Sequence, residues 1–335
     1  MANLEMEKDQ LNAEEQRKQA KKEEKAQAKL AKKEKKMASA LESGSATAEE
    51  TPEKKNREKM RKQKTINGRK LKNWKNKRGK NLYVGELALR ACDVDLANRW
   101  RPSAIFVGSQ EFGELASIFL GCSHQDLADK GAFFILLRQR IEVMQYPRAA
   151  DALRAETWAG EVQRTIFPRY YRYFDEEGTL CATASTLWAL CSIEERKIIR
   201  PQDIGLTMPP PPFEELPQPG KLRFEEAPDF VRIYKVRYSD MDYNGHVNNT
   251  RYVDWCCDLF ATERFKEHSF KDLQINYVHE ARQGEEVRLE LRDRGDSFSI
   301  RGSLQESGQV IFQAAGNWMD ALPNEQWRLL AEDDE

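Results

Sequence analysis

The same order of predicted elements occurs twice in this sequence, and this repeat constrains the fold more than any other feature. Alternation of apolar and polar residues predicts strands, and a longer apolar periodicity predicts a helix. Each copy is predicted to contain a strand, a long helix and then four strands. In the first copy these lie at residues 83–92, 102–120, 132–146, 153–163, 169–175 and 179–191. In the second copy they lie at residues 230–238, 249–265, 270–279, 286–294, 297–306 and 310–319. A sheet of about five strands with one apolar helix encloses a single core, and two such units can join their sheets. The predicted class is α+β, with two antiparallel sheets each wrapped around a long helix.

Short sequence similarities support a duplication. Residues 90–95 (RACDVD) parallel residues 237–242 (RYSDMD), which lie 147 positions later. Residues 151–156 (DALRAE) parallel residues 285–290 (EEVRLE), which lie 134 positions later. Because the offset falls along the chain, the first copy is expected to carry extra residues around its helix.

Composition marks the boundaries of the two copies. Residues 1–80 contain 25 Lys and Arg against 13 Asp and Glu, so a basic arm of net charge +12 precedes a remainder of net charge −13. Eight of the 13 prolines fall within residues 201–228, which predicts an extended, semi-rigid linker. The predicted divisions are 1–80 (arm), 81–200 (first copy), 201–228 (linker), 229–321 (second copy) and 322–335 (acidic tail).

The arm is expected to be mostly disordered or loosely helical. It has too little apolar surface to offset the entropy lost on ordering. Its charge can attract an acidic protein, nucleic acid or an anionic membrane, although such a run is more often a solvated tail. Trp74 is its only aromatic residue, which weakens the interpretation that it stacks on nucleic-acid bases.

The six cysteines show neither C-x-x-C pairs nor zinc-ligand spacing. Reduced thiols of this kind favour a reducing cytoplasm, or a plastid if the source is a plant or alga. No run of about 18 apolar residues predicts a membrane span, and the N-terminus lacks the apolar segment of a secretory signal. The sequence implies no metal and no redox cofactor.

Polar residues gather where a predicted strand of the second copy leads into its predicted helix. Alternation along extended chain would place Asp242, Asn244 and His246 on one side. A carboxylate can activate water or orient an imidazole, and a histidine can move a proton near neutral pH. These residue types are suited to hydrolysis, although a capping turn with a hydrogen-bonded histidine explains them equally well.

The residues that follow can serve a helix N-terminus. Asn248 or Asn249 can cap the helix, because a short polar side chain satisfies its free amides. Amides near Val247, Asn248 and Asn249 can also stabilise a developing oxyanion. Cys256 and Cys257 lie within the predicted helix, where packing is the expected role.

Residues 237–252 (RYSDMDYNGHVNNTRY) resemble the signature of the plant and bacterial acyl-acyl-carrier-protein thioesterases, a family built from two hot-dog folds in tandem. Residues 140–148, which contain Tyr-Pro-Arg, resemble a segment of the family's first domain. The resemblance covers about residues 81–319. It implies a tandem hot-dog fold in which the second domain is catalytic and the first shapes the acyl pocket.

The resemblance also assigns the site. The family's D-x-N-x-H motif falls on Asp242, Asn244 and His246, and a further acidic residue falls on Glu280. Many plant members have cysteine beside that acidic residue, where this chain has Ala281, so direct attack by water is favoured over a cysteine nucleophile. The first copy lacks the histidine, which implies one competent site per chain.

The implied function is hydrolysis of fatty acyl-carrier-protein thioesters, which ends chain elongation. The implied partner is an acyl carrier protein bearing a fatty acyl chain, and a homodimer is compatible with the sequence. An acyl-CoA thioesterase of the same fold is a near alternative. A non-enzymatic acyl-binding or regulatory hot-dog protein is an alternative of a different class.

Overall fold

The computed structural model of the protein describes residues 65–66, 69–70, 76–77, 79–224 and 227–321. Most of the predicted arm (1–80) and the predicted acidic tail (322–335) lie outside these residues. The described part of the arm includes a short antiparallel ladder of β1 (Thr65–Ile66) and β2 (Arg69–Lys70). All described residues belong to one compact unit of the chain.

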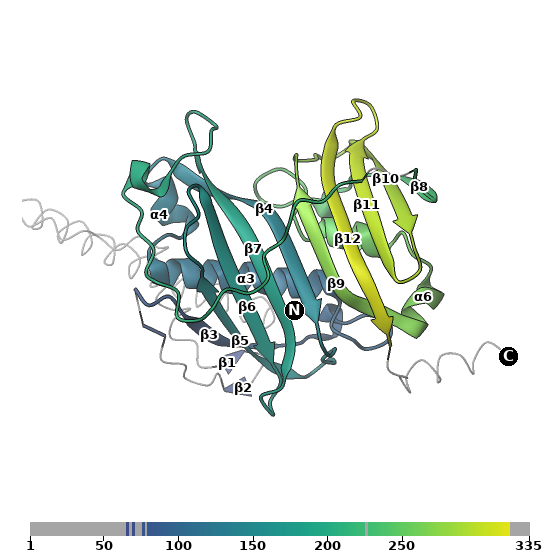
Figure 1. Cartoon of the computed structure of the whole chain (residues 1–335), viewed down its shortest axis with the longest axis horizontal. Helices are drawn as coiled ribbons and strands as arrows, with labels where there is room; N and C mark the ends of the chain where they lie inside the picture. Colours follow the sequence, from purple (N-terminus) through teal and green to yellow (C-terminus); the bar gives the residue numbers. More distant parts are fainter. Residues whose placement is uncertain (1–64, 67–68, 71–75, 78, 225–226, 322–335) are drawn as a thin grey trace, which may run out of the picture. The chain divides into compact units, whose positions relative to one another are not determined.

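Ten strands of the described chain form one antiparallel sheet (Figure 1). The first copy contributes β3 (Tyr83–Ala88), β4 (Ala132–Val143), β5 (Ala152–Ala159), β6 (Ile166–Phe174) and β7 (Leu180–Ser192). The second contributes β8 (Phe230–Lys235), β9 (His268–Tyr277), β10 (Glu286–Asp293), β11 (Ser297–Leu304) and β12 (Val310–Asp320). The order β3-β5-β6-β7-β4-β9-β12-β11-β10-β8 is symmetric about the β4–β9 pair. This symmetry confirms the duplication, and it shows that the two predicted sheets are joined edge to edge.

The long helix of the first copy is α3 (Pro102–Leu120), and its predicted bounds are confirmed. Pro102 occupies the first helical position, where a missing amide hydrogen is not needed. Gly121 ends the helix with a φ of 73°, in the left-handed region that favours glycine. A second helix that the sequence did not predict, α4 (His124–Ala128), follows and is capped by Ser123.

The long helix predicted for the second copy, residues 249–265, is wrong. The chain forms two short helices instead, α5 (Arg251–Cys257) and α6 (Thr262–Glu267). Between them Phe260 turns toward the core, and its ring lies edge-on to that of Phe298 with centroids 5.0 Å apart. Because the apolar periodicity continues through this turn, the sequence pattern could not distinguish one helix from two.

One apolar core extends through both copies. The buried cluster includes Phe106 and Tyr173 from the first copy, and Phe270 and Phe298 from the second. Such a contiguous set of contacts is typical of a single folded interior. The two copies therefore share a core in addition to the β4–β9 strand pair.

The proline-rich linker between β7 and β8 crosses the sheet on the side away from α3 (Figure 1). Two of its aromatic rings lie against arginines of the sheet. The guanidinium of Arg172 is 4.2 Å from the ring centre of Phe213, and that of Arg301 is 4.7 Å from the ring centre of Phe224. These cation–π contacts hold the linker against both copies.

Those two arginines also bind a buried glutamate that occurs at matching positions in the two copies. Arg172 lies 3.1 Å from the carboxylate of Glu156, and Arg301 lies 2.7 Å from that of Glu290. A buried carboxylate is costly without charged, hydrogen-bonded partners. The glutamates that end the repeated segments 151–156 and 285–290 therefore make the same kind of ion pair in each copy.

Replacing Glu290 by glutamine should destabilise the protein at neutral pH and matter less in acid. Burial alone would raise the pKa of Glu290, but Arg301 and Arg288 lower that pKa overall. The carboxylate's stabilisation is therefore present above the unfolded-state pKa of about 4.3, and it is lost as the pH falls through the lower folded-state pKa. Urea unfolding of both proteins at neutral pH and near pH ~3 measures the difference. An equal difference at both pH values would contradict this account.

Candidate catalytic site

The loop between β8 and α5 holds three of the predicted site residues in a closed turn. It begins with a single 3-10 turn (Tyr238–Asp240), and an isolated β-bridge closes it. The carboxylate of buried Asp240 accepts hydrogen bonds from the Arg237 amide at 2.7 Å and the Tyr234 hydroxyl at 2.9 Å. These two contacts brace the loop.

Gly245 allows the loop to fold back on itself. Its φ of 81° lies in the left-handed region, and its amide donates to the carbonyl of Asp242 at 3.1 Å. The amide of Asp242 in turn donates to the carbonyl of His246 at 3.0 Å. These backbone contacts bring the side chains of Asp242 and His246 close together.

His246 lies between two carboxylates. Its Nδ1 is 3.7 Å from Oδ2 of Asp242, and its Nε2 is 3.8 Å from Oε1 of Glu280. The side-chain amide of Asn244 is 3.4 Å from Oδ2 of Asp242. The two histidine contacts are longer than hydrogen bonds, but catalytic hydrogen bonds often tighten only when substrate binds. The structure thus brings the four predicted residues together, and their catalytic roles stay a prediction.

The two carboxylates differ in their surroundings. The side chain of Asp242 is 14% exposed, and its Oδ1 accepts the Asn244 amide at 2.8 Å. The side chain of Glu280 is 61% exposed and has no hydrogen bond to another residue in the described ranges. A restrained carboxylate beside Nδ1 can orient the imidazole, whereas an exposed carboxylate can hold and deprotonate water.

Two of the three amides predicted to stabilise an oxyanion are already occupied. The Val247 amide donates to the carbonyl of Ala281, and the Asn248 amide to that of Asp240, both at 2.9 Å. The prediction of free donors at these two positions is wrong, because each amide has only one hydrogen and it is already used. The Asn249 amide has no acceptor among the described residues, so it stays a candidate donor.

The predicted helix cap is wrong in its position. Helix α5 begins at Arg251, and Thr250 is the residue at the cap. The side-chain oxygen of Asn248 accepts hydrogen bonds from the Thr250 amide at 2.9 Å and from its hydroxyl at 2.8 Å. Asn248 therefore holds the residue that precedes the helix instead of capping the helix itself.

Cys256 and Cys257 both lie in α5. Cys256 is fully buried in the apolar cluster, which confirms its predicted packing role. Burial raises the pKa of both thiols. A thiol with a raised pKa forms little of the thiolate that acts as a nucleophile, which disfavours cysteine chemistry at this helix.

Two features were missed from the sequence, one beside the site and one in the matching loop of the first copy. Tyr243 is exposed, and its ring lies 6.4 Å from that of His124 in α4, so the first copy reaches the site loop. Arg99 occupies the position in the first copy's loop that His246 occupies in the second, 147 residues later. The repeat offset visible in the sequence could have identified Arg99.

Among the residues that the structure describes, no helix is long and apolar enough to cross a membrane. The same residues contain no group of three or more His, Cys, Asp or Glu side chains placed to hold a metal ion.

Solved structures share this fold. An acyl-ACP thioesterase from Bacteroides thetaiotaomicron matches with a TM-score of 0.62 and 20% identity, covering 71% of this chain and 98% of that one. The 12:0-ACP thioesterase from Umbellularia californica matches with a TM-score of 0.63 and 18% identity, covering 72% and 98%. The expected tandem hot-dog fold is therefore confirmed.

Sequence comparison identifies the family. The model of the acyl-ACP thioesterase N-terminal domain matches residues 80–204, and that of the C-terminal domain matches residues 225–320. The chloroplastic oleoyl-acyl carrier protein thioesterase 2 of Arabidopsis thaliana is 25% identical over 167 residues, 46% of each chain. The chloroplastic dodecanoyl-acyl-carrier-protein hydrolase of Cinnamomum camphora is 23% identical over 215 residues, 61% of this chain and 54% of that one. The chain spans about half the length of these curated relatives. Because both domain models match in order over most of its length, the protein belongs to the acyl-ACP thioesterase family.

Proposed function

We propose that the protein hydrolyses the thioester between a fatty acyl chain and acyl carrier protein, and so ends chain elongation. The observation that carries this proposal is the placement of His246 between the carboxylates of Asp242 and Glu280. A histidine flanked by two carboxylates can both accept and deliver protons near neutral pH. Membership of the family supports the substrate class.

In the proposed reaction a water molecule attacks the thioester carbonyl directly. Glu280, whose side chain is exposed, holds this water and takes its proton, while Asp242 orients His246. The carbon–sulfur bond breaks as the tetrahedral intermediate collapses, and protonated His246 gives its proton to the thiolate. Glu280 then returns the water's proton to the histidine, so a fatty acid and a thiol leave and the site is restored.

The negative charge on the tetrahedral intermediate needs hydrogen-bond donors. We assign this role to the side-chain amide of Asn244 and the backbone amide of Asn249. A positioned donor is worth most where charge develops in the transition state. The backbone amides of Val247 and Asn248 are not assigned this role, because both already donate hydrogen bonds to backbone carbonyls.

The remaining parts of the proposal concern the rest of the chain. The first copy (81–200) supplies the surface for the acyl chain, the linker is 201–228, and the second copy (229–321) carries the reacting groups. The basic arm (1–80) attracts the acidic carrier protein. The protein works in a reducing compartment, either the cytoplasm or a plastid, and a homodimer is compatible with this function.

An assay that follows thiol release from the same acyl chain on acyl carrier protein and on CoA tests the proposal. We expect hydrolysis of both thioesters, with a higher kcat/KM on the carrier. A higher kcat/KM on CoA would favour an acyl-CoA thioesterase. Acyl binding without hydrolysis of either thioester would favour a binding or regulatory protein and would overturn the proposal.

A further inference from the structure

The loop that carries the site has a counterpart in the first copy with the same backbone pattern. An isolated β-bridge closes each of the two loops. The amide of Asp95 donates to the carbonyl of Arg99 at 2.8 Å, as the amide of Asp242 donates to that of His246 at 3.0 Å. The first loop therefore keeps the aspartate and has an arginine in place of the histidine.

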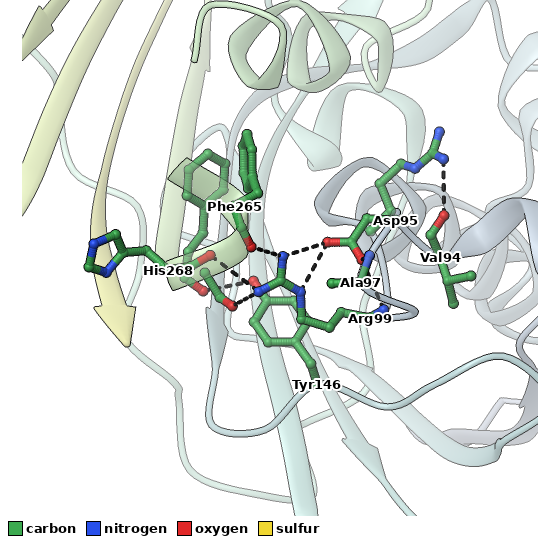
Figure 2. Close-up of polar contacts among 10 residues, drawn as sticks. Val94, Asp95, Ala97, Arg99, Tyr146, Phe265 and His268 are labelled. Carbon is green, nitrogen blue, oxygen red and sulfur yellow. Dashed lines mark hydrogen bonds and ion pairs between the residues drawn. The ribbon is translucent and has the colours of Figure 1, made fainter. Parts of the chain in front are cut away.

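The side chain of Arg99 crosses from the first copy to the second. Its Nη1 donates to the hydroxyl of Ser269 at 2.6 Å and to the carbonyl of His268 at 3.2 Å, and its Nη2 donates to the carbonyl of Phe265 at 2.6 Å. Figure 2 shows the guanidinium directed at the corner where α6 meets β9, with Phe265 and His268 at that corner. We call Arg99, Asp95 and these three acceptors the Arg99 latch.

The side chain of Arg99 is nearly closed to solvent, and its charge is balanced by Asp95. The side chain of Arg99 is 11% exposed, and Oδ2 of Asp95 lies 3.1 Å from its Nε and 3.0 Å from its Nη2. Oδ1 of Asp95 accepts the amides of Ala97 and Arg99, which fixes the carboxylate in the loop. A planar guanidinium can satisfy this set of acceptors at once, whereas a lysine ammonium cannot.

A second contact ties the copies at the same corner. The hydroxyl of Tyr146, which follows β4, donates to the carbonyl of Phe270 in β9 at 2.8 Å. The guanidinium of Arg99 lies 6.0 Å from the ring centre of Tyr146, and the two side chains are adjacent in Figure 2. The corner is therefore held by two side chains of the first copy.

The latch and the site lie toward opposite ends of one strand. Strand β9 begins at the latch, pairs with β4 of the first copy, and ends at Tyr277, just before Glu280. The copies also meet near the site, where Tyr243 contacts His124. Strands β4 and β9 pair over only five residues each. The hydrogen bonds of the latch therefore add a further contact between the two copies.

We propose that Arg99 is a positioning residue that determines specificity: it aligns the first copy against the second and so sets which acyl chains the enzyme accepts. This inference rests on the proposed function, in which the acyl chain lies against the first copy. Asp242, His246 and Glu280 all belong to the second copy, so their mutual positions do not depend on the latch. Loosening it should therefore alter chain selection and leave bond breaking intact.

The test is the ratio of kcat/KM for hexadecanoyl to kcat/KM for butanoyl on the same carrier protein, measured for wild type and Arg99→Met. In the proposed function a long acyl chain reaches from the site to the first copy, whereas a butanoyl group is too short to do so. We expect the ratio to move toward unity by about 10-fold, through a higher KM for the long chain, because a misaligned first copy would bind that chain more weakly. We also expect kcat for butanoyl and its pH profile to stay as in wild type.

The ratio separates this role from a purely structural one. Partial unfolding would lower the activity on the hexadecanoyl and butanoyl substrates equally, and it would leave the ratio of their kcat/KM values unchanged. Arg101→Met is the matched control, because the exposed side chain of Arg101 makes its hydrogen bond within the described residues to the carbonyl of Val94, in its own loop. Arg99→Lys and Tyr146→Phe are milder changes for the case in which Arg99→Met does not fold, and they should shift the ratio in the same direction.

An unchanged ratio in Arg99→Met, or in both milder variants if that protein does not fold, would overturn the inference. A shift of equal size in Arg101→Met would overturn it as well. Wild-type protein that hydrolyses neither chain would refute the proposed function, which is a separate outcome from an unchanged ratio.

Discussion

Replacing His246 by alanine should lower kcat/KM for a fatty acyl-carrier-protein thioester by about 10²- to 10⁴-fold, the usual contribution of a general acid–base group. The imidazole lies within 4 Å of two carboxylates, and the proposed reaction needs it to protonate the leaving thiolate. Without it, the thiolate must leave unprotonated and the proton on Glu280 has no acceptor within the site. The loss should fall mainly on kcat, since the acyl chain is proposed to bind elsewhere.

Steady-state thiol release measures this effect, and two further variants make it specific. Asp242→Ala should show a loss of similar order, because its carboxylate orients the imidazole. Cys257→Ser should keep most of the activity, since the raised pKa of that thiol disfavours a nucleophilic role. Wild-type turnover in both Asp242→Ala and His246→Ala would remove the catalytic assignment.

Replacing Phe270 by alanine should cost about 3–5 kcal/mol in the free energy of unfolding, the range for a large buried aromatic residue. Phe270 is 1% exposed in β9, and its ring lies 4.6 Å from Trp318 and 4.9 Å from Phe298, between ring centres. Truncation would leave a cavity among rings that cannot all shift to fill it. The same strand begins at the Arg99 latch, so this packing also supports the corner that the latch holds.

Urea unfolding followed by circular dichroism measures this loss. Phe230→Ala is the matched control, because Phe230 lies on the edge strand β8 and is 42% exposed, so it should change stability much less. Equal losses in the two variants would contradict the view that the aromatic cluster around Phe270 is a tightly packed part of the core.

The fold was largely predictable from the sequence, because the alternation of apolar and polar residues shows which side chains of each strand are buried. The repeat of this pattern indicates two similar copies. The helix at Pro102–Leu120 could be bounded because Pro102 and Gly121 mark its ends. The second helix could not be predicted correctly, because the turn at Phe260 interrupts the helix without interrupting the apolar pattern. Edge-to-edge joining of the sheets depends on contacts between distant strands, which no local pattern reports.

The site was predictable only where residue type decides the chemistry. Asp242, Asn244 and His246 could be selected because they are close in sequence on one loop, while Glu280 required the family resemblance. Whether the backbone amides of the loop are free to donate could not be predicted. The acceptor of the Val247 amide, for example, is the carbonyl of Ala281, which lies on a separate segment of the chain. Arg99 was missed because its role depends on Ser269, which lies in the other copy.

The most direct test of the account is the free fatty acid released by a host that expresses the chain, compared with the same host expressing Asp242→Asn at equal level. Asparagine keeps the size of the side chain but removes the charge that the account assigns to orienting His246. The account predicts that the wild-type chain raises free fatty acid and that Asp242→Asn leaves it near the level of the empty host. An equal rise from both chains would contradict the claim that this loop performs the hydrolysis.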